Sequence, residues 1–223
     1  MAKDARRTGW KQDPEAVKAD ILRIAVQHFA THGLAGARVD EIARQTATSK
    51  RMIYYYFKDK EGLYQAALES EYERVRAGEW ELELEGLDPV QAMTRLIEYT
   101  FDFHRENPNF VRMIAIENIH NGTFLERSAR IRALNLRAVE KVDEIYGAGV
   151  RAGAFRAGLE PLELHWTMSA MSFYNVSNRI TFSVGFGPEL FSDSGQLGLR
   201  DSVTNTILRA ILSPMALREY NAA

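Results

Sequence analysis

Residues 37–60 have the sequence ARVDEIARQTATSKRMIYYYFKDK, which predicts two short helices joined by a tight turn. The first is predicted over 39–45, where apolar residues recur at the i, i+3, i+4 spacing of one buried helix face. The second is predicted over 50–57, and Ser49 can cap it because its hydroxyl can accept from backbone N–H groups two or three residues on. The short residues at 46–49 interrupt the apolar periodicity, so the stretch predicts a helix-turn-helix.

The second predicted helix leaves basic and phenolic side chains on its outer face and flanks. Lys50 and Arg51 begin it, and three consecutive tyrosines follow at 54–56. Arginine and lysine match guanine O6 and N7 in the major groove, while tyrosine hydroxyls and lysines reach phosphates. A solvated basic helix with aromatic packing is the alternative. The turn spacing, the cap, the basic start and the phenols together favour DNA binding.

The predicted DNA-binding residues lie in and around these two helices. They are Arg38, Thr48, Ser49, Lys50, Arg51, Met52, Tyr54, Tyr55, Tyr56 and Lys60. Lys60 begins the next predicted helix, which Asp59 can cap, and the exposed backbone N–H groups there make a natural phosphate clamp with the lysine. This helix is the only covalent link between the N-terminal head and the rest of the chain.

The same stretch resembles the TetR family of one-component repressors. The matching positions are Val39-Asp40-Glu41-Ile42-Ala43, Ser49-Lys50, Ile53-Tyr54-Tyr55-Tyr56-Phe57 and Lys60-Glu61-Gly62-Leu63, in about the first quarter of the chain. The resemblance implies a helical body with a small-molecule pocket and a dimer formed through the last two helices. It also implies a mechanism in which ligand in the body rotates the linking helix and changes the spacing of the two heads.

The chain departs from the family pattern at two places. The family turn has glycine followed by valine or isoleucine, whereas Ala47 and Thr48 occupy those positions here. Alanine tolerates a left-handed conformation poorly, at a cost of about 1 kcal/mol, so a more helical or slightly strained turn is expected. Arg51 and Met52 replace the usual Gly-Thr at base-facing positions. Arg51 could select guanine and Met52 could contact a thymine methyl, so the operator sequence should differ.

Composition excludes several classes of protein. The 223 residues include no cysteine, which excludes disulfides, thiol nucleophiles and thiolate metal sites. No apolar run approaches the ~18 residues of a membrane span, and the charged N-terminus lacks the apolar centre of a signal peptide, so we expect a cytoplasmic protein. No GxSxG, HExxH or phosphate-binding glycine loop is present, so we expect no enzyme and no cofactor.

Charge is distributed unevenly along the chain. Residues 1–63 hold 12 Lys and Arg against 8 Asp and Glu, a net charge of +4. Residues 64–223 hold the other 16 and 22, a net charge of −6. A basic head suits phosphates, and an acidic body avoids them.

The N-terminal head is expected to contain one further helix, which precedes the two predicted helices 39–45 and 50–57. Asp13-Pro14-Glu15 gives it a cap and a proline at its first position, its apolar stripe packs behind the other two helices, and it ends before Gly33. Residues 1–12 are interpreted as a mobile arm that adds phosphate contacts or as a plain disordered terminus. His28 and His32 are expected to face solvent or to cap, with no metal role.

The fold class predicted from these patterns is all-α, with about nine helices, three in the head and six in the body. Domain 1–60 is the predicted helix-turn-helix domain, including the 1–12 arm, and domain 61–223 is the predicted ligand-binding and dimerisation domain. Beyond the head, helices are expected over about 60–78, 89–106, 109–120, 128–150, 161–184 and 199–212, with a short one over 123–127 and a glycine-rich loop over 185–198.

The body is expected to form a homodimer. The predicted helix 161–184 has apolar residues almost all round, so it must be covered on more than one side. With the apolar residues of 199–212 it can build a four-helix interface across a two-fold axis. Two heads on that axis match a palindromic operator with half-sites one helical turn, or a multiple, apart.

A small-molecule pocket in the body is predicted from polar and aromatic residues. They are His104, Met113, Glu117, His120, Arg130, Trp166, Phe173, Tyr174, Asn175 and Arg179. Core packing or a satisfied hydrogen bond is the simpler interpretation of each alone. As a set they indicate an apolar-aromatic cavity for a small ring compound or an organic acid.

The function predicted from the sequence is that of a ligand-responsive transcriptional regulator, most simply a repressor released from a palindromic operator when a small molecule binds the body. The alternative is a DNA-binding protein without a small-molecule ligand, either architectural or controlled by a protein partner. A thermal midpoint that moves with added metabolites would distinguish the two.

Overall fold

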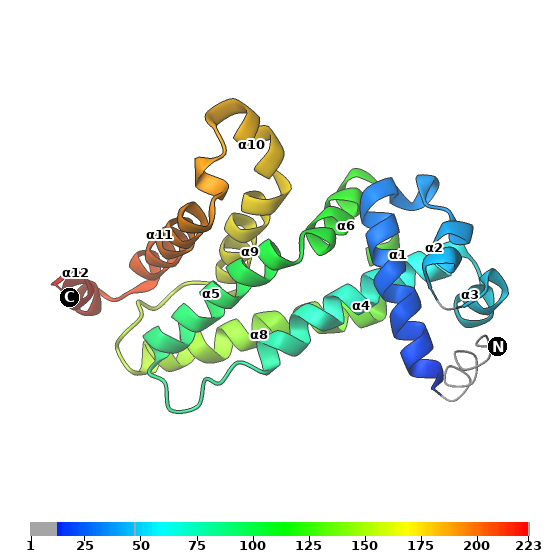
Figure 1. The fold of residues 1–223 in the computed structure, drawn as a ribbon. Coiled ribbons are helices and arrows are strands. Elements are labelled where there is room, and N and C mark those ends of the chain that lie inside the picture. The colour runs from blue at the N-terminus through cyan, green and yellow to red at the C-terminus, as the bar shows by residue number, and fades with distance from the viewer. Residues whose placement is uncertain (1–12, 47, 223) are drawn as a thin grey trace, which may run out of the picture. The chain divides into compact units, whose positions relative to one another are not determined.

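The computed structural model describes residues 13–46 and 48–222, and these form an all-helical fold (Figure 1). The described part has no strand, only an isolated bridge between Phe155 and Leu212. Its α-helices are α1 (Pro14–Gly36), α2 (Val39–Gln45), α3 (Lys50–Phe57), α4 (Lys60–Trp80), α5 (Pro89–Glu106), α6 (Pro108–Ile119), α7 (Thr123–Arg127), α8 (Ala129–Arg151), α9 (Pro161–Ser177), α10 (Arg179–Phe186), α11 (Asp193–Ile211) and α12 (Pro214–Ala222), with a 3₁₀ helix η1 (Glu189–Phe191). The predicted arm 1–12 and the turn conformation of Ala47 lie outside the described residues.

The all-α prediction is confirmed, but the predicted count of about nine helices is wrong, because the described residues contain twelve α-helices. The short α7 forms in addition to the nine, the predicted helix 161–184 is two helices, and α12 was not predicted. Along these described ranges no helix is both long and apolar enough to cross a membrane.

The ends of α1 follow the predicted capping chemistry. The Asp13 side chain accepts hydrogen bonds from the backbone N–H groups of Glu15 and Ala16, both at 3.1 Å. Gly33 has a positive φ of 64°, a conformation that favours glycine, and it breaks the helical geometry near the end of α1. The regular part of the helix therefore ends before Gly33, as predicted.

The prediction for His28 is wrong, because its side chain is buried between α1 and α2. Its Nε2 lies 2.9 Å from the side-chain Nε2 of Gln45, at the end of α2. A polar pair across the two helices thus replaces the expected contact with water. His32, one turn later, is exposed as predicted.

The expected single helix over 161–184 is interrupted at Asn178, which leaves α9 and α10 as separate helices. Asn178 has φ −104° and ψ 5°, and its side-chain amide donates to the hydroxyl of Ser177. Short polar side chains that bond locally compete with the helical backbone pattern. The apolar periodicity continues through this break, so periodicity alone could not locate it.

The last long helix begins at Asp193, not at Leu199, so the predicted loop over 185–198 is shorter than expected. The hydroxyl of Ser192 caps α11 by accepting from the N–H of Gly195 at 3.1 Å. A Cβ at Gly195 would lie 2.3 Å from the carbonyl oxygen of Glu189, so only glycine allows η1 to pack this closely. Gly195 therefore indicates close packing here, not a loop.

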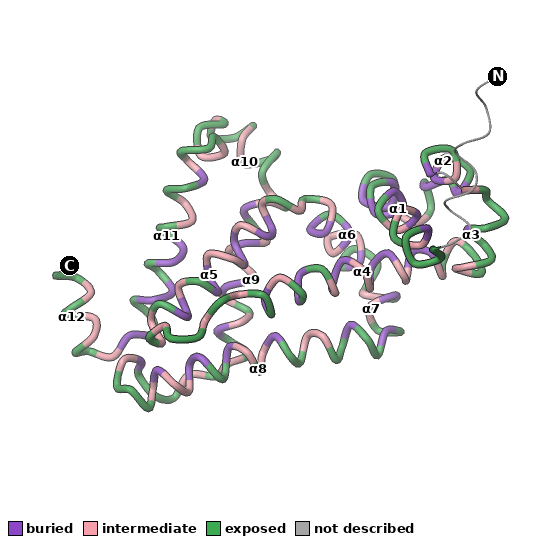
Figure 2. The backbone as a smooth tube through the Cα atoms, turned by 60° about the horizontal axis from the view of Figure 1, so that its bottom comes forward, coloured by how far each residue is buried: buried purple, intermediate pink, exposed green. Residues whose placement is uncertain are grey.

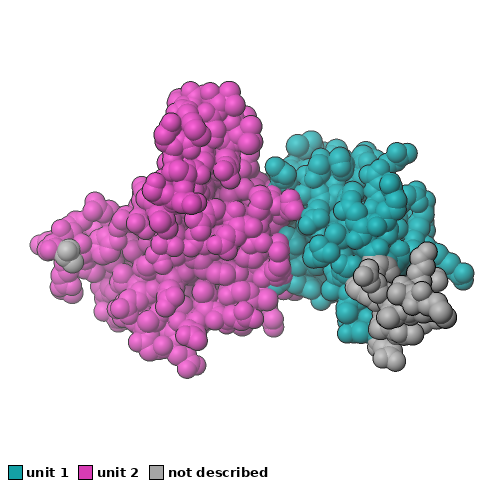
Figure 3. All heavy atoms as spheres, viewed as in Figure 1, with its two compact units in different colours: residues 1–73, 112–131 teal, residues 74–111, 132–223 magenta. Residues whose placement is uncertain are grey.

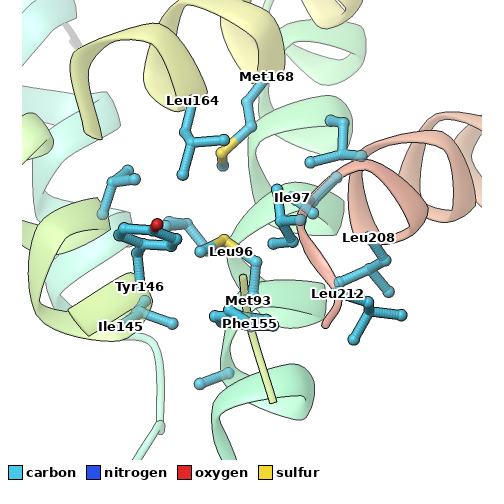
Figure 4. Close-up of a cluster of buried hydrophobic side chains, with 14 of the residues drawn as sticks. Met93, Leu96, Ile97, Ile145, Tyr146, Phe155, Leu164, Met168, Leu208 and Leu212 are labelled. Carbon is cyan, nitrogen blue, oxygen red and sulfur yellow. The ribbon is translucent and has the colours of Figure 1, made fainter. Parts of the chain in front are cut away.

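The chain divides into two compact units, coloured separately in Figure 3. Unit 1 comprises residues 1–73 and 112–131, and unit 2 comprises 74–111 and 132–223. Unit 2 is built around α5, which packs against both α9 and α11. Its core includes Met93, Leu96 and Ile97 from α5, and other helices surround these side chains (Figure 4).

Candidate nucleic-acid interface and apolar pocket

The helix-turn-helix in unit 1 is held together by two fully buried isoleucines. Ile42 of α2 and Ile53 of α3 each have 0% of their surface exposed. The hydroxyl of Ser49 accepts from the N–H of Met52 at 3.3 Å, which confirms the predicted cap of α3. Helix α3 therefore has one fixed, buried side and begins at the predicted residue.

The opposite side of α3 faces solvent (Figure 2). Lys50 and Arg51 are exposed in its first turn, and Met52 and Tyr54 are 36% and 37% exposed. Tyr55 is 75% exposed, and its ring has an edge contact with that of Tyr56 at a centroid distance of 5.3 Å. The predicted base-facing and phosphate-facing residues thus share one accessible helix surface.

Two residues of this surface already have partners within unit 1. The ammonium of Lys50 donates to the Asp40 carboxylate of α2 at 2.9 Å. This hydrogen bond is the main reason that the pKa of Lys50 is raised above its usual value. Tyr56 is partly buried, and the Lys18 ammonium of α1 lies 5.6 Å from its ring centroid.

The start of α4 lies close against the end of α3. The Asp59 side chain accepts from the N–H of Gly62 at 2.7 Å, so the predicted cap of α4 is confirmed. A Cβ at Gly62 would lie 2.1 Å from the Phe57 carbonyl oxygen, so only glycine fits. The Lys60 ammonium donates to the Ala35 carbonyl at 3.1 Å, which directs this predicted phosphate ligand toward the end of α1.

Two further predicted residues lie at the edges of the pair. Arg38 is exposed and occupies the N-cap position of α2, where its side chain makes no capping bond. Thr48 is partly exposed in the turn before α3.

Comparison with known proteins identifies both parts of the chain. Residues 21–67 match the family model of bacterial regulatory proteins, tetR family, and residues 89–207 match that of the tetracyclin repressor-like C-terminal domain. The chain belongs to the TetR family. It is 30% identical to the HTH-type transcriptional repressor NicS of Pseudomonas putida over 207 residues, which cover 92% of this chain and 98% of NicS.

Solved TetR-like structures share this fold at low sequence identity. The fatty acid degradation regulator FadR of Bacillus halodurans matches 88% of this chain and 96% of its own, with a TM-score of 0.68 and 18% identity. FadR of Bacillus subtilis, solved in complex with stearoyl-CoA, matches 85% of this chain and 97% of its own, with a TM-score of 0.65 and 17% identity.

This TetR-family protein is a ligand-responsive transcriptional regulator with a helix-turn-helix, as the sequence predicted. Members of the family bind DNA operators as dimers, and many bind small-molecule effectors. The names of the related proteins are those of transcriptional regulators, not of enzymes.

Four of the predicted pocket residues lie in unit 1 and have different environments. Glu117 is 1% exposed and accepts from the hydroxyl of Tyr64 at 2.9 Å. Met113 is fully buried, and Arg130 is exposed and forms an ion pair with Glu73. His120 is exposed at a shallow hollow beside the end of α1.

Three predicted pocket residues in unit 2 line one open apolar pocket of about 560 Å³. Trp166, Tyr174 and Asn175 contribute to its wall, together with residues of α10, η1 and α11. Asn175 and Gln196 bond to each other through both amides, at 2.8 and 3.0 Å, so Asn175 has its partners within the protein. The structure thus separates the predicted set instead of gathering it.

The remaining predicted residues in unit 2 do not line this pocket. Phe173 is partly buried, and the Arg179 guanidinium lies 5.8 Å from the ring centroid of Phe191. His104 is 7% exposed and lies in a separate polar cluster with Arg76 and His165.

Sequence reasoning missed the members of that cluster other than His104. Arg76 and Glu79 form an ion pair in which each side chain is less than 10% exposed. Their i, i+3 spacing was the available signal, but on a helix interpreted as a link such pairs are usually solvated. Among the described residues no group of three or more His, Asp or Glu side chains could hold a metal ion.

Proposed function

We propose that the protein is a repressor that binds an inverted-repeat operator as a homodimer and leaves it when a small molecule binds the body. The observation that supports this most directly is the accessible outer face of α3, with Lys50 and Arg51 in its first turn. In this proposal residues 1–60 form the DNA-binding domain, residues 61–223 bind the effector and dimerise, and the protein acts in the cytoplasm.

Arg51 and Met52 are the proposed base-reading residues. Both are exposed in the first turn of α3, the part of a recognition helix that enters the major groove. A guanidinium can bond the O6 and N7 atoms of guanine, and a thioether can contact a thymine methyl. These two side chains therefore set the operator sequence in our proposal.

The remaining predicted residues are proposed to hold the DNA backbone. Hydroxyl and ammonium groups that surround the reading helix fix its register on the phosphates without reading sequence. They are Arg38, Thr48, Ser49, Lys50, Tyr54, Tyr55, Tyr56 and Lys60.

The dimer surface is proposed on α9 and α11, as predicted, and is extended by α10. Leu162, Trp166 and Tyr174 follow one another at four-residue multiples along α9 and are 63%, 70% and 56% exposed. In α10, Ile180 and Val184 are 70% and 84% exposed. A group of several large, exposed apolar side chains is typical of a surface that another molecule covers. Trp166 and Tyr174 then contact the partner subunit, not the effector.

The effector is proposed to be a small ring compound or an organic acid. FadR of Bacillus subtilis, which shares this fold, has been solved in complex with stearoyl-CoA, and this supports an effector among organic acids and their derivatives. In a regulator of this type the effector raises the thermal midpoint of the protein and lowers its affinity for DNA. An architectural DNA-binding protein shows neither change.

Selection of binding sites from random duplex DNA tests the proposal. At about 150 mM salt, where nonspecific phosphate binding is weakened, we expect enrichment of an inverted repeat. Enrichment of a single half-site would contradict the dimeric operator. If nothing is enriched with or without a metabolite pool, the repressor proposal is wrong.

Two substitutions then test the roles within α3 and α4. Arg51→Ala should cost about 1–3 kcal/mol of binding free energy and relax the preference at one position of each half-site. Lys60→Ala should weaken binding to all sequences equally, because phosphates carry no base identity. Arg151→Ala, which changes an exposed arginine of α8, is the control and should leave operator affinity unchanged.

Sedimentation tests the dimer surface. Trp166→Asp should convert the dimer to a monomer, because the dimer interface would then bury a carboxylate that has no partner. Trp80→Asp is the matched control, since Trp80 of α4 is also exposed, at 57%, but lies outside the proposed surface. A dimer that survives Trp166→Asp would place the interface elsewhere.

A further inference from the structure

A cluster of buried and partly buried polar side chains lies in unit 2, and we call it the Arg76 cluster. It consists of Arg76 and Glu79 from α4, His104 from α5, Asn135 from α8 and His165 from α9. Arg76, Glu79 and His104 are each only 7% exposed. Four helices thus contribute polar groups to one cluster of the body, and three of them, α4, α5 and α9, contribute ionisable ones.

The hydrogen bonds of Arg76 use only part of its guanidinium. Nη1 donates to both carboxylate oxygens of Glu79, at 2.5 and 2.6 Å. Nη2 makes one long bond of 3.5 Å to the amide oxygen of Asn135. Nε is buried and has no hydrogen-bond partner among the residues that the structure describes. Buried donors without acceptors are rare, because leaving them unpaired is unfavourable.

The unused part of the guanidinium has the geometry of an anion site. In a planar guanidinium the Nε–H bond and the nearer Nη2–H bond point the same way, so together they form a fork that fits the two oxygens of a carboxylate. Glu79 occupies Nη1, on the other side of the group. A second carboxylate can therefore bind Arg76 without displacing Glu79.

The two histidines add neutral groups beside this fork. Nδ1 of His104 lies 2.6 Å from the Thr100 carbonyl and must donate to it, which leaves Nε2 as an acceptor in the neutral ring. Burial, followed by the charge of Arg76 and by His104, lowers the pKa of His165 to about 4. Burial and neighbouring charge, and no hydrogen bond, account for the lowered pKa of His165. A neutral imidazole carries one N–H group, which can donate to a bound ligand.

Aromatic rings lie next to the cluster. The His104 ring centroid is 5.7 Å from that of Phe110 and 6.4 Å from that of Phe103, both in edge-on geometry. Phe103 and Phe110 are buried, so their surfaces favour a flat apolar group over water. A ligand that satisfies both features has a charged end for Arg76 and a ring for this wall.

We propose that the Arg76 cluster is the effector site and that it binds a small aromatic carboxylic acid through the free Nε–Nη2 fork of Arg76. This inference rests on the proposed function, since it names the ligand class of a ligand-responsive body. His165 donates to the second carboxylate lone pair, and the ring of the acid packs beside His104. Glu79 stays bound to Nη1 and balances the charge of Arg76 when no ligand is present.

Benzoate and benzamide are the probes, because they have the same shape and differ in charge. With the full-length protein, benzoate should raise the thermal midpoint and bind with measurable heat, whereas benzamide should do neither. Arg76→Lys keeps the positive charge next to Glu79 but removes the fork, so benzoate affinity should fall about tenfold or more. Arg137→Lys, the same change at an exposed position of α8, is the control and should bind benzoate as the unaltered protein does.

A site-specific readout separates binding at Arg76 from an effect on folding. The nuclear magnetic resonance signal of the Arg76 Nε–H group, assigned by its loss in Arg76→Lys, should shift when benzoate is added. Absence of benzoate binding, equal binding of benzamide, or full binding by Arg76→Lys would each overturn the inference. These outcomes do not depend on DNA, so failure to select an inverted repeat would overturn the proposed function alone.

Discussion

Two buried carboxylates, Glu117 in unit 1 and Glu79 in unit 2, have contrasting hydrogen-bond environments. One oxygen of Glu117 accepts from the Tyr64 hydroxyl at 2.9 Å, and the other accepts from the backbone N–H groups of Phe124 and Leu125 at 3.0 and 3.2 Å. Burial, and then the bond to Glu117, raises the pKa of Tyr64, so its hydroxyl remains a donor. Every oxygen of Glu117 therefore has a partner within unit 1.

Glu79 is also bonded, but its partner Arg76 is not fully used. Burial raises the pKa of Glu79 although the nearby charge of Arg76 opposes this, and Nε of Arg76 has no partner among the described residues. A complete network fixes structure, because each group would lose a bond if it moved. An incomplete network leaves bonding capacity for a ligand. The difference distinguishes a structural site from a candidate binding site more sharply than residue type does.

The largest expected effect is at the complete site. Glu117→Leu keeps the side-chain volume but leaves two buried donors and one partly buried donor without an acceptor, so it should lower the free energy of unfolding by about 4 kcal/mol. Urea denaturation measures this. Glu85→Leu, at an exposed loop position, is the control and should change stability little. A cost below about 1 kcal/mol would mean that Glu117 is not a structural residue.

A smaller loss is expected at the incomplete site. Arg76→Met removes the partner of Glu79 and should cost about 2–3 kcal/mol, because Glu79 can take up a proton instead of remaining an unpaired charge. The double variant Arg76→Met/Glu79→Leu should recover part of that loss, since it removes both charges. If the double variant loses the sum of the stability losses of Arg76→Met and Glu79→Leu in urea denaturation, the two residues are not coupled.

The pH dependence should come from the incomplete site. The pKa of His165 is about 4 in the folded protein, below the ordinary 6.5, and that of His104 is also lowered by burial. At these two histidines the unfolded chain therefore binds more protons between about pH 6.5 and 4, so their contribution to stability is full above that window and falls as the pH drops through it. Between pH 7 and 5 His165 should contribute a loss of about 1–2 kcal/mol.

Denaturation at a series of pH values checks this expectation. His165→Gln removes the titrating group, so it should flatten the curve between pH 7 and 5. His32→Gln, which alters an exposed histidine of α1, should leave the slope as it is. An unchanged slope in His165→Gln would assign the acid sensitivity to other groups.

The smallest effect is expected for Tyr64→Phe. It removes one of the three donors to Glu117 while the aromatic contacts with Phe29 and Phe124 remain, at ring centroid distances of 5.0 and 4.9 Å. The loss should be about 1 kcal/mol, the usual net value of one hydrogen bond. A loss as large as that of Glu117→Leu would place the stabilising role on Tyr64 and not on the carboxylate.

Sequence predicted the bounds of several helices closely, with a side-chain cap at the start of α3 and α5 and without one at α2. The bounds 39–45, 50–57 and 89–106 agree with α2, α3 and α5, and a side-chain cap is present at Ser49 and Asp88. The break at Asn178 was missed because apolar periodicity crosses it. Such a break depends on local competition for hydrogen bonds, which a periodicity count does not contain.

The binding sites were predictable to different degrees for a related reason. Exposure of the outer face of α3 follows from burial of Ile53 on α3 against α2, which local spacing predicts, so the sequence was sufficient. The environment of Glu117 and of Arg76 depends on side chains that other helices bring from distant positions, such as Asn135 and His165. A carboxylate on an apolar helix looks the same in sequence whether its partners are protein groups or a ligand.

The ion pair between Lys50 and Asp40 has a consequence for how binding responds to counterions. A lysine that already has a carboxylate at 2.9 Å attracts fewer anions from solution than a free lysine does. When such a lysine moves to a DNA phosphate, fewer ions are released, so the affinity depends less on salt. Asp40 must also find a new cation when the pair breaks. Asp40 thus acts as an internal competitor of the DNA backbone, and Asp40→Asn should tighten binding at low salt while making the affinity fall more steeply as salt is added.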